Sequence, residues 1–361
     1  MKSVESLPSV DVVRDAGALV LEPGVLDALT LQAEAALLRQ GESENTLRSY
    51  RSALRYWAAW FALRYGRPIS VPVATETVVQ FLVDHVQRDR DGELVSELPA
   101  AVDQALVSGG FKGHLGAPAM STVIHRVAVL SKLHQLQGVE NPCDQTRVRE
   151  LLGKARRGYA KRGALPSKKP ALTREPLEAL LETCDASLIG LRDRALLLFA
   201  FGSGGRRRSE VVAATMENTR RVGDGYVYSL VHSKTNQFGA DRPENHKPVA
   251  GRAAHALTAW LAASKIKSGA IFRRVHGAAT LGAALSPAAV RDIVKKRCQL
   301  AGLEEGFSAH SLRSGFVTEA GLQGVPLGET MALTGHRTAA SVVGYFRAGY
   351  EGSQAAKLLD S

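Results

Sequence analysis

Four residues near the end of the chain have the types and the spacing needed to attack a phosphodiester. His310 and Arg313 occur in the segment His-Ser-Leu-Arg, His336 ends the segment Leu-Thr-Gly-His, and Tyr345 follows nine residues later. Tyrosine is a weak nucleophile at its free pKa, so it needs a nearby base and groups that stabilise the phosphate charge. Imidazoles and a guanidinium can supply both. The segment therefore indicates phosphodiester attack without a metal.

Two shorter signals precede this segment. Arg207 lies in the run Arg-Arg-Arg-Ser-Glu, residues 206–210, and Lys234 lies in Ser-Lys-Thr after a segment rich in Tyr and Val. Taken alone, the first is typical of a helix start with a serine cap. The second, taken alone, is typical of an exposed lysine in a hairpin.

The composition limits the class of partner. A net charge of +11 over 361 residues favours a polyanion, either nucleic acid or an anionic membrane surface. The longest apolar run, Ala195 to Phe201, is too short to cross a bilayer, and the N-terminus mixes acids into what would be a signal peptide. Cys143, Cys184 and Cys298 form no C-x-x-C pair, which argues against a disulfide framework or a zinc site. We therefore expect a cytoplasmic protein with no metal or other cofactor.

The first part of the chain shows helical periodicity and no strand-like alternation. After a loose arm at 1–24, the pattern predicts an all-α domain over 25–153. Its predicted helices cover 26–39, 44–63, 75–88, 97–107, 120–137 and 145–158.

A basic stretch at 154–171 without acids, broken by Gly and Pro, separates this domain from the rest. It predicts either a solvated linker or a strap against a DNA backbone. The second domain, 172–345, is predicted to be mixed α/β, mostly helical, with a small antiparallel sheet formed by 225–231 and the segment His-Lys-Pro-Val-Ala-Gly, and 346–361 forms a tail. Its predicted helices cover 174–184, 189–201, 209–216, 253–265, 286–301, 310–322 and 326–333.

The order of these motifs resembles that of the tyrosine recombinases, the phage integrase family that includes Cre-like enzymes. The family has an arginine in an R-x-S-E-like motif, a hairpin lysine, H-x-x-R, G-H or G-W, and a tyrosine nine residues further on. The matching residues here are Arg207, Lys234, His310, Arg313, His336 and Tyr345. The resemblance covers nearly all of the second domain, and extends more thinly to the first.

This resemblance implies a site-specific recombinase that cleaves and rejoins DNA through a 3′-phosphotyrosyl intermediate, with no metal or ATP. Tyr345 would be the nucleophile, and His310 would accept its proton. Lys234 would protonate the departing 5′-oxygen. Arg207 and Arg313 would hold the non-bridging oxygens, and His336 would hydrogen-bond the phosphate.

Several assignments stay open at this point. Lys247, on the second expected strand, rivals Lys234, and Arg206 or Arg208 would replace Arg207 if the register were off by one residue. Tyr350 comes five residues too late for the family spacing. A metal site built from His232, His246, His310 and His336 has no supporting spacing. The competing functions are a type IB topoisomerase and a non-catalytic DNA-binding protein of the same fold.

The expected partner is double-stranded DNA with a short inverted-repeat site, bound by a homo-tetramer on two such sites, and no membrane. Arg48 is the expected phosphate contact, and Ser121, Thr122 and His125 are the expected groove contacts. In the resembling enzymes the tail docks on a neighbouring protomer. The expected setting is the cytoplasm of a bacterium, with the gene carried by the cell, a phage or a plasmid.

Overall fold

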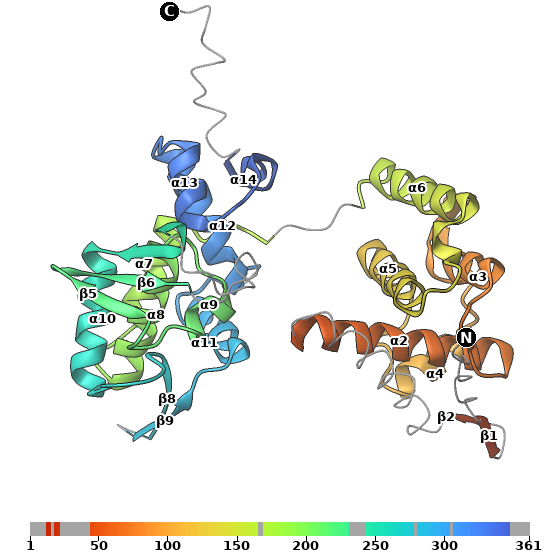
Figure 1. Ribbon diagram of the computed structural model, residues 1–361, viewed down its shortest axis with the longest axis horizontal. Helices are drawn as coiled ribbons and strands as arrows, with labels where there is room; N and C mark the ends of the chain where they lie inside the picture. The colour runs from red at the N-terminus through yellow and green to blue at the C-terminus, as the bar shows by residue number, and fades with distance from the viewer. Residues whose placement is uncertain are drawn as a thin grey trace, which may run out of the picture. The chain divides into compact units, whose positions relative to one another are not determined.

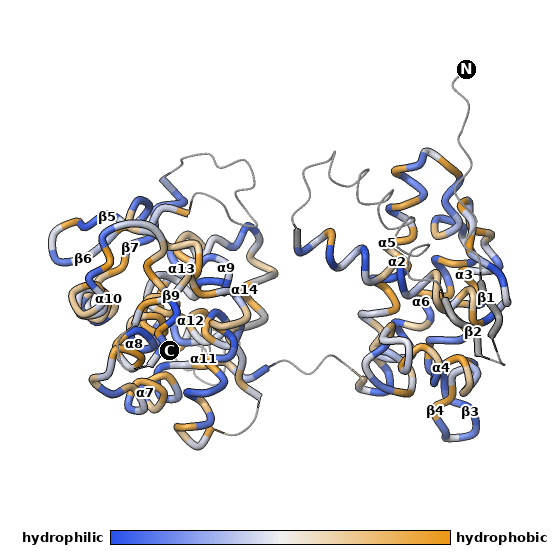
Figure 2. The backbone as a smooth tube through the Cα atoms, turned by 90° about the horizontal axis from the view of Figure 1, so that it is seen from below, coloured by the Kyte–Doolittle hydropathy of each residue, from blue (hydrophilic) through white to orange (hydrophobic). Residues whose placement is uncertain are grey.

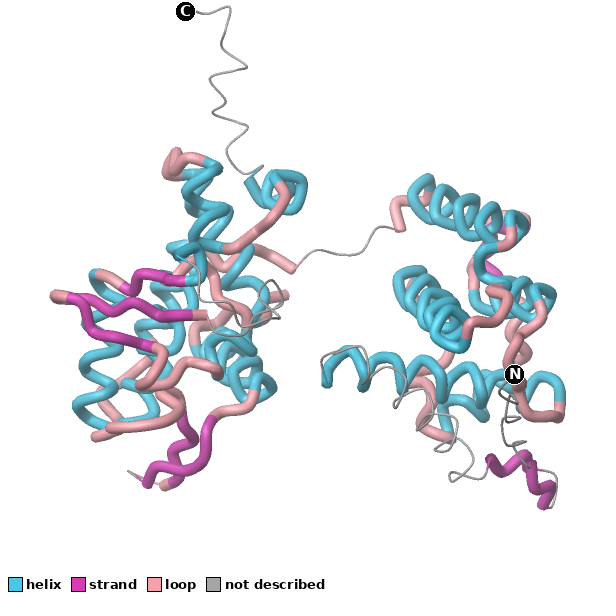
Figure 3. Tube along the Cα trace, viewed as in Figure 1, coloured by secondary structure: helices cyan, strands magenta, loops and turns pink. Residues whose placement is uncertain are grey.

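The chain divides into two compact units, Met1–Pro166 and Ser167–Ser361. This division is seen in a computed structural model that describes residues 12–15, 18–21, 44–164, 169–230, 243–277, 280–303 and 306–346 (Figure 1). Each unit has its own hydrophobic core. Helices dominate both units, with short antiparallel strands between them (Figure 3).

The first unit packs its helices around a cluster of aromatic side chains. Trp57 stacks on Phe81 with ring centroids 3.8 Å apart, and Trp60 meets the same ring edge-on. The helices are α2 (Glu44–Tyr65), α3 (Thr75–His85), α4 (Ala100–Ser108), α5 (Met120–Gln137) and α6 (Thr146–Lys161). The predicted helix at 44–63 matches α2, whose residues Leu47, Leu54, Trp57 and Phe61 recur at helical spacing and are buried. The helix expected at 26–39 lies outside the described residues.

Two short hairpins in this unit depart from the all-α expectation. They are β1 (Val12–Asp15) with β2 (Ala18–Leu21), in the segment expected to be an arm, and β3 (Arg88–Arg90) with β4 (Glu93–Val95). The second hairpin turns at Asp91 and Gly92, which both have positive φ. An Asp-Gly pair is a recognised hairpin signal, but the flanking strands are too short and polar to show alternation.

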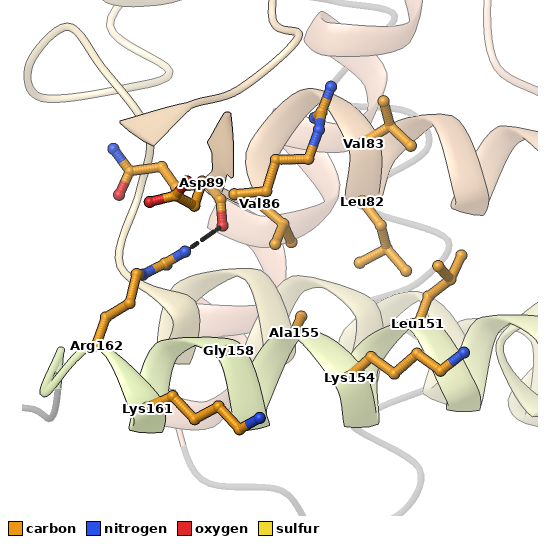
Figure 4. A pocket seen from close by; sticks show the side chains of 12 residues that line it. Leu82, Val83, Val86, Asp89, Leu151, Lys154, Ala155, Gly158, Lys161 and Arg162 are labelled. Atoms are coloured by element: carbon orange, nitrogen blue, oxygen red, sulfur yellow. Dashed lines mark hydrogen bonds between the residues drawn. The ribbon is translucent and has the colours of Figure 1, made fainter. Parts of the chain in front are cut away.

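A pocket of about 610 Å³ lies between α3 and α6 (Figure 4). Its apolar wall includes Leu82 from α3, Val86 just after that helix and Leu151 from α6, while Lys154 and Lys161 lie along the side of α6. Because α6 continues to Lys161, the first half of the stretch expected to be a basic linker is helical.

The second unit places helices around a small antiparallel sheet. The sheet order is β5 (Thr219–Val222), β6 (Gly225–Ser229) and β7 (His246–Val249), and a separate hairpin pairs β8 (Arg273–His276) with β9 (Thr280–Ala284). The helices are α7 (Arg174–Glu182), α8 (Leu188–Gly202), α9 (Arg208–Val212), α10 (Gly251–Ser264), α11 (Pro287–Leu300), α12 (Ala309–Leu322), α13 (Leu327–Thr334) and α14 (Ala339–Phe346). The predicted pairing of the Tyr-rich strand with His-Lys-Pro-Val is confirmed, whereas β5, β8 and β9 were not expected.

The core of the second unit forms around α8, which packs against α10 and α12. Most helices of both units contain hydrophobic and hydrophilic residues interspersed along their length, as amphipathic helices require (Figure 2). One close backbone contact fixes α12. Leu172 N donates to Ser311 O at 2.9 Å, and a Cβ on Gly315 would lie 1.8 Å from Leu172 O. Only glycine allows the segment before α7 to cross α12 at this point.

Candidate active site

The start of α12 presents His310 and Arg313. Ser308 caps the helix: its Oγ accepts from His310 N at 3.3 Å, while Ser308 N donates to Ser311 Oγ at 2.9 Å. Such a cap satisfies backbone N–H groups that the first turn leaves without helical partners. The His310 side chain is exposed and Arg313, one turn later, is buried. The cap therefore fixes where the helix begins and so places both residues.

Arg313 joins three segments that are far apart in the sequence. Its NH1 donates to Gly205 O at 3.0 Å, and its NH2 donates to Thr334 O at 2.8 Å and lies 3.2 Å from His336 Nε2. Gly205 has a φ of 66°, and a Cβ there would lie 2.7 Å from Arg313 Cα. The glycine-rich turn before α9 is thus needed for this close approach to α12.

Three cations cap the C-terminal end of α13. Lys247 Nζ donates to Ala332 O at 2.6 Å, and Arg206 NH2 donates to Leu333 O at 2.5 Å. Arg313 takes the next carbonyl, that of Thr334. The last carbonyls of a helix have no partner within the helix and carry partial negative charge, so cations stabilise them. The helix then ends at Gly335, which has a φ of 72°, and His336 follows directly.

His336 is half-buried and hydrogen-bonded on both ring nitrogens. Its Nδ1 lies 2.7 Å from Thr334 Oγ1, and its Nε2 lies beside Arg313. Burial, followed by the positive charges of Arg313, Arg207 and Arg206 and by His310, lowers the pKa of His336 to about 4. The ring is therefore neutral at neutral pH in the DNA-free protein.

His310 carries the same bias toward the neutral form. Partial desolvation, followed by the charges of Arg313, Arg207 and Arg208, lowers its pKa from the ordinary value. A neutral imidazole can accept a proton, whereas an imidazolium cannot, so this environment suits His310 for general-base work.

The arginine run separates into three different environments. Arg206 is 1% exposed, Arg208 is exposed, and Arg207 is half-buried with its NH1 2.5 Å from Glu210 Oε1. Glu210 is itself buried and also faces Arg206, 3.6 Å away. Arg207 is thus a partly accessible guanidinium beside both histidines, which supports the predicted register. The serine cap considered for this run is wrong, because α9 begins at Arg208 and its N-cap is Arg207.

Of the two candidate lysines, the structure describes only Lys247. Lys247 lies on β7 and is 3% exposed, with Nζ donating to Glu244 O at 2.5 Å as well as to Ala332 O. Burial, followed by the charge of Arg206, lowers its pKa to about 8. Two backbone carbonyls thus hold Lys247 at the end of α13, and it stays an alternative to Lys234. Lys234 lies outside the described residues and remains a prediction.

The backbone of Tyr345 belongs to α14, which packs against α12 and α13. Val342 of α14 is fully buried, which anchors the helix to the unit. The helix that carries Tyr345 is therefore next to the helices that lead to Arg313 and His336. Tyr350 lies outside the described residues.

Among the described residues, no group of three or more His, Cys, Asp or Glu side chains is arranged to hold a metal ion. His232, a member of the metal set considered above, lies outside them. In the same part of the chain, no helix has the length and apolar character to cross a membrane.

Residues 170–351, just over half of the chain and including this whole site, match the Phage integrase family. The chain belongs to this family. It is 29% identical over 330 residues to an integrase/recombinase XerD homologue of Selenomonas ruminantium, an alignment that covers 90% of this chain and 87% of that protein. The predicted family is therefore confirmed.

Solved structures share the fold of this integrase-family protein. The XerH site-specific recombinase bound to palindromic difH substrate, in a post-cleavage complex, gives a TM-score of 0.56 at 15% identity, covering 95% of this chain and 86% of that chain. The Tn1549 transposon integrase in complex with transposon right end DNA gives 0.57 at 13% identity, covering 91% and 98%. A lambda integrase dimer bound to a COC′ core site gives 0.54 at 15% identity, covering 90% and 78%. The predicted fold class, mainly helical with a small antiparallel sheet, is confirmed.

The first unit of this integrase-family protein has a polar groove of about 390 Å³ between the N-terminal parts of α2 and α5. Its lining includes three of the four residues predicted to contact DNA, Arg48, Thr122 and His125. His125 Nε2 lies 2.8 Å from Ser49 Oγ, so the two helices are joined across the groove. Ser121 is exposed and does not line it.

Five lining residues were missed in the sequence: Asn45, Ser49, Ser52, Ala53 and Arg126. The first three fall at i, i+4 and i+7, so helical spacing from Asn45 would have grouped them. The Arg126 guanidinium lies 3.2 Å from the centre of the Tyr56 ring, a cation–π contact between α5 and α2. Nothing in the local sequence predicted that contact.

Proposed function

We propose that the protein is a site-specific DNA recombinase that cleaves and rejoins DNA by transesterification at Tyr345. The observation that carries this proposal is the convergence of Arg313, His336 and Arg207 at the end of α13, in a chain of the phage integrase family. These groups provide donors and positive charge for a phosphate without a metal.

Cleavage forms one bond and breaks another. Tyr345 Oη attacks the phosphorus and passes its proton to His310, while the bond from phosphorus to the 5′-oxygen breaks and Lys234 protonates that oxygen. The products are a 3′-phosphotyrosyl link and a free 5′-hydroxyl. Rejoining is the same reaction in reverse with a second 5′-hydroxyl, so the bond energy is conserved and neither ATP nor another cofactor is needed.

The phosphate-binding groups contribute most to the rate in this mechanism. The pentavalent transition state carries extra negative charge on its non-bridging oxygens, which Arg207 and Arg313 hold through guanidinium N–H groups. The charge of the bound phosphate also opposes the effect that lowers the pKa of His336. His336 therefore becomes able to donate a hydrogen bond once DNA is bound.

The proposed substrate is double-stranded DNA with a short inverted repeat, gripped through the α2–α5 groove of the first unit. A homo-tetramer would hold two such sites. The neighbour bound to a palindromic substrate supports a symmetric target. We place this activity in the bacterial cytoplasm, where DNA and a reducing environment are both present.

Covalent capture tests the proposal directly. Wild type and Tyr345→Phe are expressed in cells, non-covalent protein is stripped with hot detergent, and the DNA that stays attached is sequenced. The expected result is DNA retained by wild type alone, clustered at one inverted repeat. Scattered covalent DNA would indicate a topoisomerase, and equal retention in both samples would exclude Tyr345 as the nucleophile. Absence of retained DNA from cells that carry the cognate site would point to a non-catalytic DNA-binding protein.

Assembly through the tail, residues 346–361, is a separate part of the proposal. The tail includes Ala355, Ala356, Leu358 and Leu359, an apolar set at the end of the chain. Truncation after Ala348 should leave cleavage of a single site intact and abolish the paired complex in native gels. Undiminished pairing by the truncated protein would refute tail docking without affecting the proposed chemistry.

A further inference from the structure

A chain of hydrogen bonds links the reacting groups to the last turn of α13. Arg313 NH2 lies 3.2 Å from His336 Nε2, and His336 Nδ1 lies 2.7 Å from Thr334 Oγ1. Thr334 Oγ1 in turn donates to Met331 O at 3.3 Å. Thr334 is 1% exposed, so solvent has little access to its hydroxyl.

The donor in each link follows from the chemistry of the two ends. A guanidinium has only donors, so His336 Nε2 must accept from Arg313 with its lone pair. In a neutral imidazole the proton is then on Nδ1, and Thr334 Oγ1 accepts from it. The hydroxyl is able to accept because its own proton goes to Met331 O. Each group has one role, and the opposite tautomer would place two donors face to face at Arg313.

We propose that Thr334 is a positioning residue that holds His336 in the Nδ1–H tautomer, with the basic Nε2 beside Arg313 at the phosphate site. The proposal rests on the proposed function, because it assigns Nε2 to the phosphate that Arg313 binds. When DNA arrives, Arg313 NH2 turns its donor from Nε2 to the phosphate, and a proton taken from solvent adds to Nε2. The imidazolium then donates from Nε2 to a phosphate oxygen and keeps its Nδ1–H bond to Thr334.

The backbone allows a contact between residues only two positions apart. Gly335 adopts a φ of 72° with α13 ending at Thr334, so the chain turns and the ring of residue 336 meets the hydroxyl of residue 334. A residue with a Cβ rarely adopts this conformation, so Gly335 and Thr334 act together.

The charged surroundings agree with a proton that arrives only with DNA. The groups that act on His336 are Arg313 and His310 from α12 and Arg206 and Arg207 from the turn before α9. None of them is an acid, so among the described residues nothing that acts on His336 favours an imidazolium, and the phosphate would supply the negative charge that does.

Nitrogen-15 NMR of the histidine rings tests the tautomer on the full-length, DNA-free protein. His336→Gln identifies the His336 signals by their loss. The expected wild-type pattern at neutral pH has the proton on Nδ1, and Thr334→Ser should keep it. Thr334→Val, in which Arg313 still faces Nε2 but Nδ1–H has no acceptor, should show a mixture of the two tautomers. A wild-type pattern with the proton on Nε2 would overturn the proposal. Because this outcome is measured on the wild-type protein, it does not depend on whether a variant folds. This measurement does not depend on cleavage, so a protein that fails to cut DNA would refute the proposed function alone.

The pH dependence of covalent-complex formation gives a second readout. Thr334→Val should slow cleavage by roughly tenfold to a hundredfold, the effect of one lost hydrogen bond to a charged group. In Thr334→Val the Nδ1–H group of the imidazolium has no acceptor. The imidazolium is then less stable, so the pKa of His336 in the DNA complex falls. The loss of rate at high pH should then begin at lower pH than in wild type, and Thr334→Ser should restore the profile. An unshifted profile in a folded Thr334→Val protein would show that Thr334 only packs.

Discussion

Three adjacent arginines, Arg206, Arg207 and Arg208, lie in environments that differ in burial. Arg206 is enclosed and donates to Leu333 O, Arg207 is partly accessible beside the two histidines, and Arg208 is exposed. Sequence order alone left the register among them open.

Alanine substitutions should separate these roles. Arg206→Ala leaves Glu210 buried with less compensation, so the free energy of unfolding should fall by about 3–5 kcal/mol. Arg207→Ala also removes a partner of the buried Glu210, though a more exposed one, so it should lower the free energy of unfolding by about 1–3 kcal/mol. It should slow covalent-complex formation on the order of 100-fold to 1,000-fold, as expected for a lost oxyanion donor. Arg208→Ala is the matched control, with both quantities near wild type. Thermal unfolding and single-turnover cleavage measure the two effects, and a catalytic loss in Arg208→Ala alone would move the register by one residue.

Two buried histidines should make the first unit sensitive to acid. His85 accepts from Tyr56 Oη at 2.7 Å, and His134 accepts from Val73 N at 2.9 Å, both through Nε2. Desolvation lowers the pKa of His85 to about 3, and it lowers that of His134 as well. Because the unfolded chain binds these protons more tightly, stability is complete above a pH of about 6.5 and falls as the pH drops below it.

The expected loss for His85 alone between neutral pH and pH 5 is about 2 kcal/mol. Hydrogen exchange at peptides from α3 and α5, measured at both pH values, reports the free energy of opening of this unit. His85→Gln and His134→Gln should each show a smaller pH dependence than wild type. An equal dependence in all three proteins would mean that other groups cause the acid sensitivity.

At the scale of elements, α12 depends on a glycine for its position. A Cβ on Gly315 would overlap Leu172 O, while one on Gly328 of α13 would meet no atom within 4 Å. Gly315→Ala should lower the free energy of unfolding by about 1–3 kcal/mol, the usual cost of overpacking, and should slow cleavage because α12 carries His310 and Arg313. Gly328→Ala should be neutral or stabilise by up to about 1 kcal/mol. Denaturant titrations of both variants test the pair, and equal stability would show that the crossing at Leu172 relaxes freely.

Helix positions were predictable because the spacing of apolar residues along a helix, and the glycines near its ends, can be seen in a short stretch of sequence. The predictions for α5, α8 and α12 differ from the structure by at most one residue at either end. The short strands β8 and β9 were missed because their segment, Arg-Arg-Val-His to Thr-Leu-Gly-Ala-Ala, alternates too briefly to give a signal.

The candidate site was predictable from the order of its motifs but not in its internal contacts. Motif spacing selected Arg313 and His336, yet nothing local shows that Arg206 and Lys247 cap the end of α13. Those bonds join residues more than eighty positions apart, so they exist only once the chain has folded. Lys247 was a rival of Lys234 for catalysis in the sequence, and it remains one.

At the scale of the whole molecule, the net charge of +11 favours DNA binding, and the α2–α5 groove is one surface through which this charge can act. The α2–α5 groove contains Arg48 and Arg126 and no acidic side chain among its lining residues. A basic groove that binds phosphates releases counterions, so affinity should fall steeply with salt.

Arg48→Gln should weaken DNA binding and reduce the slope of log affinity against log salt by about 1, because one phosphate contact is lost. Arg67→Gln is the matched control. Arg67 is exposed and lies just beyond the C-terminal end of α2. Its guanidinium packs over the Phe61 ring, 5.6 Å from the ring centre. Its slope should stay close to that of wild type, since α2 separates the two positions by about 30 Å. Fluorescence anisotropy on one labelled duplex over a range of salt concentrations measures all three slopes. Equal reductions in both variants would mean that the charge acts as a diffuse field and that the groove has no special part in binding.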